Sequence, residues 1–431
     1  MGIVLPNICH SFTTVPKQVN AGEPKDLSVS RNSNDKLLPR TIILDPLLLV
    51  TLKETINGSK NNTILKHSLK QLVLEANSFL TKKPTSVVYK DELPPSGDIH
   101  DFFSLAPYRW PDPSKKDGLP YIGRDGLTNP EIYSISDKKN LDDMIHAVIV
   151  LSAAYYFTDD LKYASKAGEL LRVWFVDNST KMNPHLKFAE TVRGKSNVYS
   201  GGIMAGRNLA DIIDVIGLIR DSSTWTKEDQ SNVESWFTKY LGWLLNSRLG
   251  KEESLKINNH GTYYYVQVAA IASFLNKTGI AKNTIEAFVQ KPTAVTFLAP
   301  EKSISVKIQP DGRQPFELQR SNTLDYSMFN LHGLFKLANV GKHLGIDLWN
   351  YRVSDAPLLQ KALDYLLPYF LKTDAWPYPQ VTEINRSLSS DLLCQGIVNY
   401  PQERVVYSRA YKSLVTNRSL IGVDSLMPCL P

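Results

Sequence analysis

The chain has few cysteines, no long apolar run and no strong excess of one charge. Only 3 of its 431 residues are cysteine, and Cys9, Cys394 and Cys429 form no CxxC pair, which excludes a disulfide framework and a zinc ribbon. One disulfide is possible, with one thiol left over. No run of about 18 apolar residues occurs, so no membrane span is expected. The 49 basic and 43 acidic residues are spread along the chain, a distribution that excludes a nucleic-acid-binding footprint.

The remaining composition is that of an ordinary globular protein with a large core. Hydrophobic residues make up 42% of the chain and charged residues 21%. The net charge of +6 suits an anionic partner, but it describes a slightly basic solvated surface equally well. Five histidines lack metal-ligand spacing, and we expect neither a metal nor a cofactor: His100, His146, His185, His332 and His343.

Apolar residues recur at helical spacing through most of the chain. The pattern predicts helices over residues 66–83, 141–157, 161–176, 208–220, 227–246, 262–275, 281–289, 326–345, 357–371 and 404–414. Neighbouring helices joined by a short turn, such as Thr158–Asp160, predict helical hairpins. Alternating strand patterns are almost absent, so we expect an all-α fold rather than a β-rich one.

Composition divides the chain into three parts. Residues 1–45 are polar and rich in Ser, Asn and Lys, which predicts a tail or strap, whereas 46–371 form the helical domain and 372–431 a C-terminal extension packed on it. Residues 84–137 are rich in Pro, Gly and aromatics, and we expect them to form a lid over a cleft. A second insertion at about 290–308 is compatible with a short β-hairpin of alternating Val295, Phe297, Ile304, Val306 and Ile308.

The stretch Ile257–Tyr263 carries the strongest chemical signal, together with two residues some way downstream. Asn259, His260, Arg320 and Tyr326 supply an amide, an imidazole, a guanidinium and a phenol. These groups can neutralise a sugar carboxylate, remove the proton beside it and protonate a leaving oxygen. They predict β-elimination of a polyuronate.

Further sequence blocks follow one another in a fixed order over roughly residues 98 to 371. They are His100–Pro113, Asp125–Gly126 with Asn129–Glu131, Ala153 with Tyr155–Phe157, Met182–Pro184, Asn258–Thr262, Gln309–Gly312 with Glu317–Leu318, and Tyr326–Ser327 with Phe329–Leu331. In these blocks the chain resembles the alginate lyase domain family of polysaccharide lyases, whose members cleave alginate or glucuronan on an all-helical α/α toroid. The insertion near residue 300 departs from the family's more compact spacing.

The resemblance implies a fold, an activity and a set of site residues. The fold would be an incomplete α/α toroid of six or seven hairpins, and the activity a metal-independent lyase on β-1,4-linked polyuronates, with mannuronate-rich alginate first and glucuronan second. Asn259, His260 and Arg320 would pin and neutralise the carboxylate, while Tyr326 would take the C5 proton and protonate the glycosidic oxygen. Where those transfers occur on opposite ring faces, His260 would be the base and Tyr326 only the acid. The expected substrate-binding residues are Tyr108, Arg109, Trp110, Asn258, Tyr264, Glu317 and Arg207.

The spacing of these residues limits where helices can begin. Arg320 and Tyr326 would lie on different faces of one straight helix, so they converge only if a helix begins between them. Thr323 is the predicted N-cap of that helix. Asn258 or Asn259 would cap the preceding one, with His260 in its first turn and Tyr264 one turn further. A Tyr326 phenolate would then depend on stabilisation by Arg320.

Each of these residues also has a structural interpretation. Asn259 and His260 could serve only as a helix cap and its neighbour, Tyr326 could be packing, and Arg320 could pair with Glu317. The Tyr108–Trp110 block could equally anchor the loop. Gly201–Asn208 imitates a phosphate loop but has Arg207 and Asn208 where Lys and Ser or Thr are needed, and a structural turn is favoured.

Two other function classes remain open at this point. An inverting glycoside hydrolase on a similar toroid would need two carboxylates flanking the bond, for which Asp311, Glu317 and Asp325 are candidates. A non-catalytic acidic-glycan-binding protein would keep aromatic residues and dispense with Tyr326.

The expected partner is an anionic polysaccharide, bound by a monomer that binds neither nucleic acid nor membrane. The first residues, Met1–Pro6, lack a full signal peptide. Glycosylation sequons occur at Asn57, Asn61, Asn178, Asn276, Asn385 and Asn417. We therefore expect a secreted protein whose leader is absent from this sequence.

Overall fold

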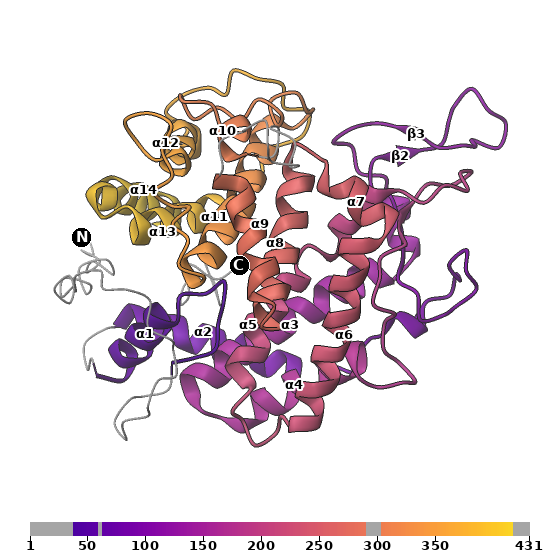
Figure 1. Ribbon diagram of the computed structural model, residues 1–431, viewed down its shortest axis with the longest axis horizontal. Coiled ribbons are helices and arrows are strands. Elements are labelled where there is room, and N and C mark those ends of the chain that lie inside the picture. Colours follow the sequence, from indigo (N-terminus) through magenta and orange to yellow (C-terminus); the bar gives the residue numbers. More distant parts are fainter. Residues whose placement is uncertain (1–37, 59–62, 290–302, 417–431) are drawn as a thin grey trace.

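The computed structural model describes residues 38–58, 63–289 and 303–416, and it is built mainly of helices (Figure 1). The helices are α1 (Pro46–Gly58), α2 (Thr63–Leu80), α3 (Asp137–Thr158), α4 (Leu161–Phe175), α5 (Leu209–Ile219), α6 (Lys227–Asn246), α7 (Arg248–Ser254), α8 (Asn259–Phe274), α9 (Thr278–Val289), α10 (Ile304–Lys307), α11 (Thr323–His343), α12 (Leu358–Leu371), α13 (Ser389–Asn399) and α14 (Arg404–Thr416). The predicted all-α fold is confirmed, and every predicted helix is present with ends shifted by a few residues. Four helices were not predicted: α1, α7, α10 and α13.

The helices form the two layers of an α/α toroid. In the inner layer α3, α5, α8, α11 and α13 each contact the next, and α2, α4, α6, α9 and α12 pack outside them. Inner helices are buried nearly all round: in α8 every residue from Gly261 to Ala272 is buried. A helix enclosed by others has no polar face. The inner layer therefore supplies rigid positions at its helix ends.

A strap from the N-terminal part of the chain packs on the inner helix α5. The backbone N–H groups of Ile42, Ile43 and Leu44 donate to the buried carboxylate of Asp214 at 2.6, 3.0 and 2.6 Å. Burial nevertheless raises the pKa of Asp214 to about 7. The described end of the predicted tail, residues 38–45, thus packs as a strap.

The segment 84–137, called the lid below, contains most of the short strands. Strand β1 (Phe103–Leu105) pairs in parallel with β4 (Phe188–Thr191), and β2 (Arg109–Trp110) pairs with β3 (Ile122–Gly123) in a hairpin that extends away from the helices (Figure 1). At the base of the lid, Lys90 forms a fully buried ion pair with Asp137 at 3.0 Å.

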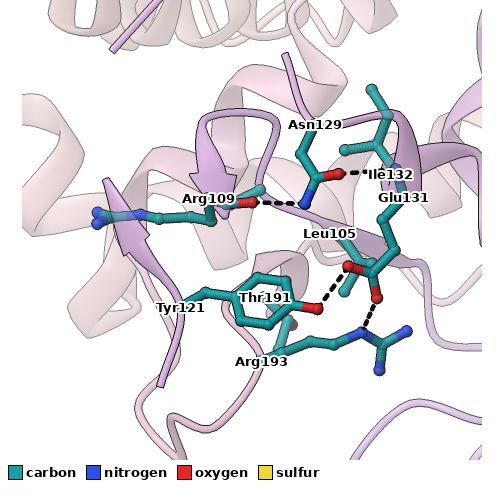
Figure 2. Close-up of a pocket in the computed structure, with 9 residues that line it drawn as sticks. Leu105, Arg109, Tyr121, Asn129, Glu131, Ile132, Thr191 and Arg193 are labelled. Carbon is teal, nitrogen blue, oxygen red and sulfur yellow. Dashed lines mark hydrogen bonds and ion pairs between the residues drawn. The ribbon is translucent and has the colours of Figure 1, made fainter. Parts of the chain in front are cut away.

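A small pocket marks a second attachment of the lid, shown in Figure 2. Arg193 binds Glu131 there and also pairs with Glu92 through two contacts of 3.1 Å. The Tyr121 hydroxyl donates to Glu131 at 2.7 Å. Because Glu92, Tyr121 and Glu131 all belong to the lid, Arg193 fastens it to the segment that follows β4.

The second insertion differs from the prediction where it is described. Residues Ile304–Lys307 form α10, with Ser303 as N-cap, so the predicted strand is wrong there, while Val295 and Phe297 lie outside the described residues. Cys394 is disulfide-bonded, and Cys9 and Cys429 lie outside the described residues. Over the described ranges, no helix is both long and apolar enough to cross a bilayer.

Candidate active site

Two cations and a histidine gather where inner helices begin. Lys138 lies in the first turn of α3, Arg207 precedes α5 and His260 lies in the first turn of α8. All three lie near enough to Glu190 to influence the pKa of its carboxyl group, which places them around one region. Helix N-termini add positive partial charge of their own. The arrangement favours an anionic ligand.

The start of α8 is fixed by its own sequence. The Asn258 side chain caps the helix by accepting from the His260 N–H at 3.3 Å, which confirms one of the two predicted caps. Asn259 donates twice to Glu317, from its backbone N–H at 2.6 Å and from its amide at 2.7 Å. A Cβ at Gly261 would collide with the carbonyl oxygen of Lys256, so only glycine fits there. The Asn-Asn-His-Gly sequence therefore sets both the helix start and the orientation of its amide.

His260 is oriented by a buried carboxylate. Its Nδ1 lies 2.6 Å from Oε1 of Glu253, whose side chain is fully buried. The other oxygen of Glu253 has no partner among the described residues. Since a carboxylate accepts, Nδ1 carries the proton and Nε2 is left for a ligand.

The start of α11 holds the other two predicted catalytic residues. Its N-cap is Asn322, so the prediction of Thr323 is wrong by one residue: Thr323 is the first helical residue, and its hydroxyl donates to Pro379. A helix start between Arg320 and Tyr326 is confirmed. It brings the guanidinium carbon of Arg320 to 3.9 Å from the centre of the Tyr326 ring.

Arg320 is held by the lid. It binds Asp125 through Nε at 3.2 Å and Nη2 at 2.7 Å, and Ser321 donates to the same carboxylate. The alternative pairing partner, Glu317, is engaged with Asn259 instead. Asp125 therefore positions the cation beside Tyr326.

The Tyr326 hydroxyl is buried and has no hydrogen-bond partner among the described residues. Burial raises its pKa well above the usual value, and nearby Tyr108 raises it further, although the two hydroxyls do not form a well-aligned hydrogen bond. Arg320 lowers the pKa of Tyr326, but its effect is smaller. In the free protein Tyr326 is therefore a phenol, and Arg320 opposes the rise in its pKa, the direction in which stabilisation of a phenolate acts.

The predicted substrate-binding residues do not all face the same space. Tyr264 is a core residue whose hydroxyl donates to the Leu244 carbonyl at 3.0 Å, because α8 is enclosed one turn past its start. The Glu317 carboxylate accepts a hydrogen bond from the Asn259 amide and so holds that amide in place. Asn258 is occupied as the helix cap. These three contact other protein groups rather than the space beside His260.

The remaining predicted binding residues belong to the lid and to the loop before α5. Arg109 and Trp110 form β2, where the Trp110 indole donates to Leu127, and Tyr108 precedes them beside Tyr326. Arg207 lies over the ring of Phe329 at 5.5 Å. Gly202 in the preceding 3₁₀ turn fits closely against the Ala189 carbonyl, which agrees with a structural role for this glycine pair.

The other acids and histidines considered from the sequence have partners of their own. Asp311 binds Arg313, and Asp325 accepts from Gln380 and Asn385. His100 contacts the Lys181 carbonyl, and His146 contacts Glu75. His185 contacts Asp101, and His332 contacts Asp391. In the described part of the chain, no three His, Cys, Asp or Glu side chains form a group suited to a metal.

Sequence reasoning missed four residues of this site. Glu253 and Asp125 orient His260 and Arg320. Tyr199 lies near enough to Glu253, Glu190, Arg109 and Arg320 for these residues to influence its pKa, which burial raises. Glu190 stands out through its left-handed backbone, with φ of 52°. None of the four lies in a pattern that periodicity reveals.

Comparison with known proteins identifies the family of the chain. The family model described as alginate lyase matches residues 86–376. The structure is similar to an alginate lyase from Bacteroides ovatus, with 33% identity, a TM-score of 0.81, and coverage of 90% of this chain and 99% of that chain. The fold is also similar to that of alginate lyase A1-III from Sphingomonas species A1, with 15% identity, a TM-score of 0.53, and coverage of 82% and 87%. A search of curated proteins gives no match. The chain belongs to the alginate lyase family and is a polysaccharide lyase.

Proposed function

We propose that this lyase cleaves β-1,4-linked polyuronates by β-elimination and leaves an unsaturated uronic acid at the new non-reducing end. The observation that carries the proposal is the unpartnered, buried hydroxyl of Tyr326 beside the Arg320 cation. Asn259 and His260, at the start of the adjacent helix α8, complete the set. The Bacteroides ovatus relative, an alginate lyase by description, supports an acidic polysaccharide as substrate.

The first requirement of this chemistry is to neutralise the substrate carboxylate. The C5 proton of a uronate is only weakly acidic while the carboxylate beside it is charged, because removing it creates a second negative charge. The Asn259 amide, Nε2 of His260 and the Arg320 guanidinium can share that charge. The buried carboxylates Glu317 and Glu253 hold the first two in place before substrate arrives.

The second requirement is a pair of proton transfers. In mannuronate and glucuronate the C5 proton and the O4 leaving group lie on the same face of the ring, so Tyr326 can take the first and protonate the second. In guluronate they lie on opposite faces, and Nε2 of His260 would take the C5 proton. The raised pKa of Tyr326 suits the acid step, and the base step relies on the opposing charge of Arg320.

Mannuronate-rich alginate is the proposed first substrate and glucuronan the second. The test is to incubate the protein with mannuronate-rich alginate, guluronate-rich alginate and glucuronan while following near-ultraviolet absorbance, which reports the conjugated C4–C5 double bond. We expect absorbance to rise fastest with mannuronate-rich alginate and next fastest with glucuronan. A rise with guluronate-rich alginate alone would contradict the proposed substrate, and no rise with any of them would contradict the elimination of polyuronates.

We also propose that the reaction needs no metal. Asn259, His260 and Arg320 together supply the positive, hydrogen-bonding surroundings that a cation supplies elsewhere. Activity should therefore survive dialysis against EDTA, measured by the same absorbance. Loss of activity that calcium specifically restores would contradict this.

Secretion and a monomeric state complete the proposal. Four sequon asparagines in the described residues are exposed and accessible to glycosylation: Asn57, Asn178, Asn276 and Asn385. A large extracellular polymer would also require the enzyme to act outside the cell. Mass measurement before and after endoglycosidase treatment of protein from its natural source tests glycosylation, and size-exclusion chromatography tests the monomer.

A further inference from the structure

Glu190 is an acidic residue of the site that the mechanism above does not use. It lies in β4, directly after Ala189, and its side chain has no hydrogen bond or ion pair among the described residues. His260, Glu253, Arg207 and Lys138 all lie near enough to influence the pKa of its carboxyl group. An acid placed among three basic groups without pairing to any of them remains available to a ligand.

The fold holds Glu190 there against a backbone preference. Its φ of 52° lies in the left-handed region, which costs a residue with a long side chain about 1 kcal/mol or more. Three contacts impose this conformation. The strand β4 pairs with β1, the Glu190 N–H donates to Ser104 Oγ at 3.0 Å, and Gly202 packs against the Ala189 carbonyl. Strain of this kind concentrates where a side chain must point in a given direction.

The surroundings of Glu190 allow its carboxyl group to act as a hydrogen-bond acceptor when ionised and as a donor when protonated. Burial raises its pKa to about 7, with Glu253 also raising it and with His260, Arg207 and Lys138 opposing. The side chain is nevertheless only partly shielded from solvent, as a group facing a ligand would be. Tyr199, itself 40% exposed, lies close enough to feel the charge of Glu190.

We propose that Glu190 is a sugar-positioning residue that binds ring hydroxyls of the uronate whose carboxylate is held by Asn259, His260 and Arg320. This inference rests on the proposed function. In its ionised form Glu190 repels the carboxylates of a polyuronate, so the groups that this form can bind are the hydroxyls at C2 and C3. Mannuronate and glucuronate differ in configuration at C2. Glu190 therefore takes part in choosing between these two sugars, because a misplaced hydroxyl leaves the acid without a partner.

Two substitutions separate this role from a structural one. Glu190→Gln keeps the length and the hydrogen-bonding capacity, whereas Glu190→Asn shortens the side chain by one methylene and tolerates the left-handed backbone. Asp159→Asn is the matched control, since Asp159 is also acidic with a positive φ of 58° but caps the far end of α3. Thermal melting of all three variants shows whether they fold.

The experiment measures kcat and KM of each variant on mannuronate-rich alginate and on glucuronan. For Glu190→Asn we expect KM on the preferred polymer to rise about tenfold and the ratio of kcat/KM between the two polymers to fall by a similar factor, the effect of one lost hydrogen bond. For Glu190→Gln, both KM and the ratio of kcat/KM should stay within a few-fold of the wild-type values. Asp159→Asn should change neither quantity. An unchanged KM and ratio in folded Glu190→Asn would overturn the inference. So would a loss in kcat alone, which would place Glu190 in the chemistry.

A binding measurement keeps this inference distinct from the proposed function. If the wild type forms unsaturated products but Glu190→Asn retains the wild-type ratio, only the role of Glu190 fails. If the wild type cleaves no polyuronate, the proposed function fails. Calorimetric titration with saturated mannuronate and glucuronate trisaccharides then decides about Glu190: about tenfold weaker binding by Glu190→Asn supports it, and equal binding overturns it.

Discussion

The starts of α8 and α11 carry the two halves of the site, and the protein holds them in different ways. At α8, Asn259 and His260 each contact a buried carboxylate, Glu317 or Glu253, that belongs to the helical body. At α11, Arg320 contacts Asp125 and Tyr326 adjoins Tyr108, and both of these partners belong to the lid. One half is thus set by the toroid, and the other is completed by the lid.

This difference separates two tasks of the reaction. Neutralising the substrate carboxylate benefits from groups that are fixed in advance, which buried hydrogen bonds provide. In the proposed reaction, proton transfer by Tyr326 depends on its pKa, which burial raises most, Tyr108 and Asp125 of the lid raise further, and Arg320 lowers. Substitutions in the α8 half should therefore change carboxylate stabilisation, and substitutions in the lid should change the proton transfers.

The largest effect is expected from Tyr326→Phe, which removes the proton-transferring oxygen and almost no volume. We expect kcat to fall about 10³-fold or more, with oligosaccharide binding nearly intact. Steady-state rates and calorimetric titration measure the two quantities. If more than about a tenth of the wild-type kcat remained, a barrier change below roughly 1.4 kcal/mol, Tyr326 would not be the acid or base.

His260→Ala should have the next largest effect. If Nε2 helps to neutralise the carboxylate or takes the C5 proton, folded protein should lose about 10²- to 10³-fold in kcat/KM. His260→Asn should retain traces of activity on mannuronate-rich blocks, where Tyr326 performs both transfers, but none on guluronate-rich blocks. Unchanged kcat/KM on every cleavable polymer would reduce His260 to a structural residue.

Glu253→Gln should have a smaller effect through His260. The amide can still contact Nδ1, but it no longer fixes which ring nitrogen carries the proton, and we expect kcat/KM to fall about 10- to 10²-fold. Glu252→Gln is the matched control, since Glu252 is adjacent but exposed and paired with Arg248. Equal activities of the two variants would show that Glu253 does not orient the catalytic histidine.

Asp125→Asn in the lid should have the smallest effect of the four. The Asp125–Arg320 pair is partly exposed, so its loss should change stability by less than about 1 kcal/mol. Because Asp125 raises the pKa of Tyr326, its removal should lower that pKa, increase the share of phenolate that can take the C5 proton, and shift the rising limb of the kcat profile on mannuronate-rich alginate to lower pH. Asp117→Asn, elsewhere in the lid, is the control. A shift to higher pH, or none, would contradict the lid's influence on Tyr326.

The sequence revealed the α8 half better than the α11 half, for physical reasons. The Asn-Asn-His-Gly block carries its cap, its catalytic groups and its close-packed glycine within a few residues, so local rules apply. Asp125 reaches Arg320 from the distant lid, and the backbone conformation of Glu190 depends on β1 and on Gly202. Tyr264 was expected to bind substrate because it lies one helical turn past His260. It is a core residue instead, because α8 is buried on all sides there.

One measurement tests the central claim, that the paired helix starts perform β-elimination, most directly. Wild-type protein is incubated with mannuronate-rich alginate or glucuronan, and the unsaturated ends are counted by absorbance against the new reducing ends. The account predicts one unsaturated end for each reducing end, and neither product from Tyr326→Phe. Reducing ends without matching unsaturation would identify hydrolysis and contradict it.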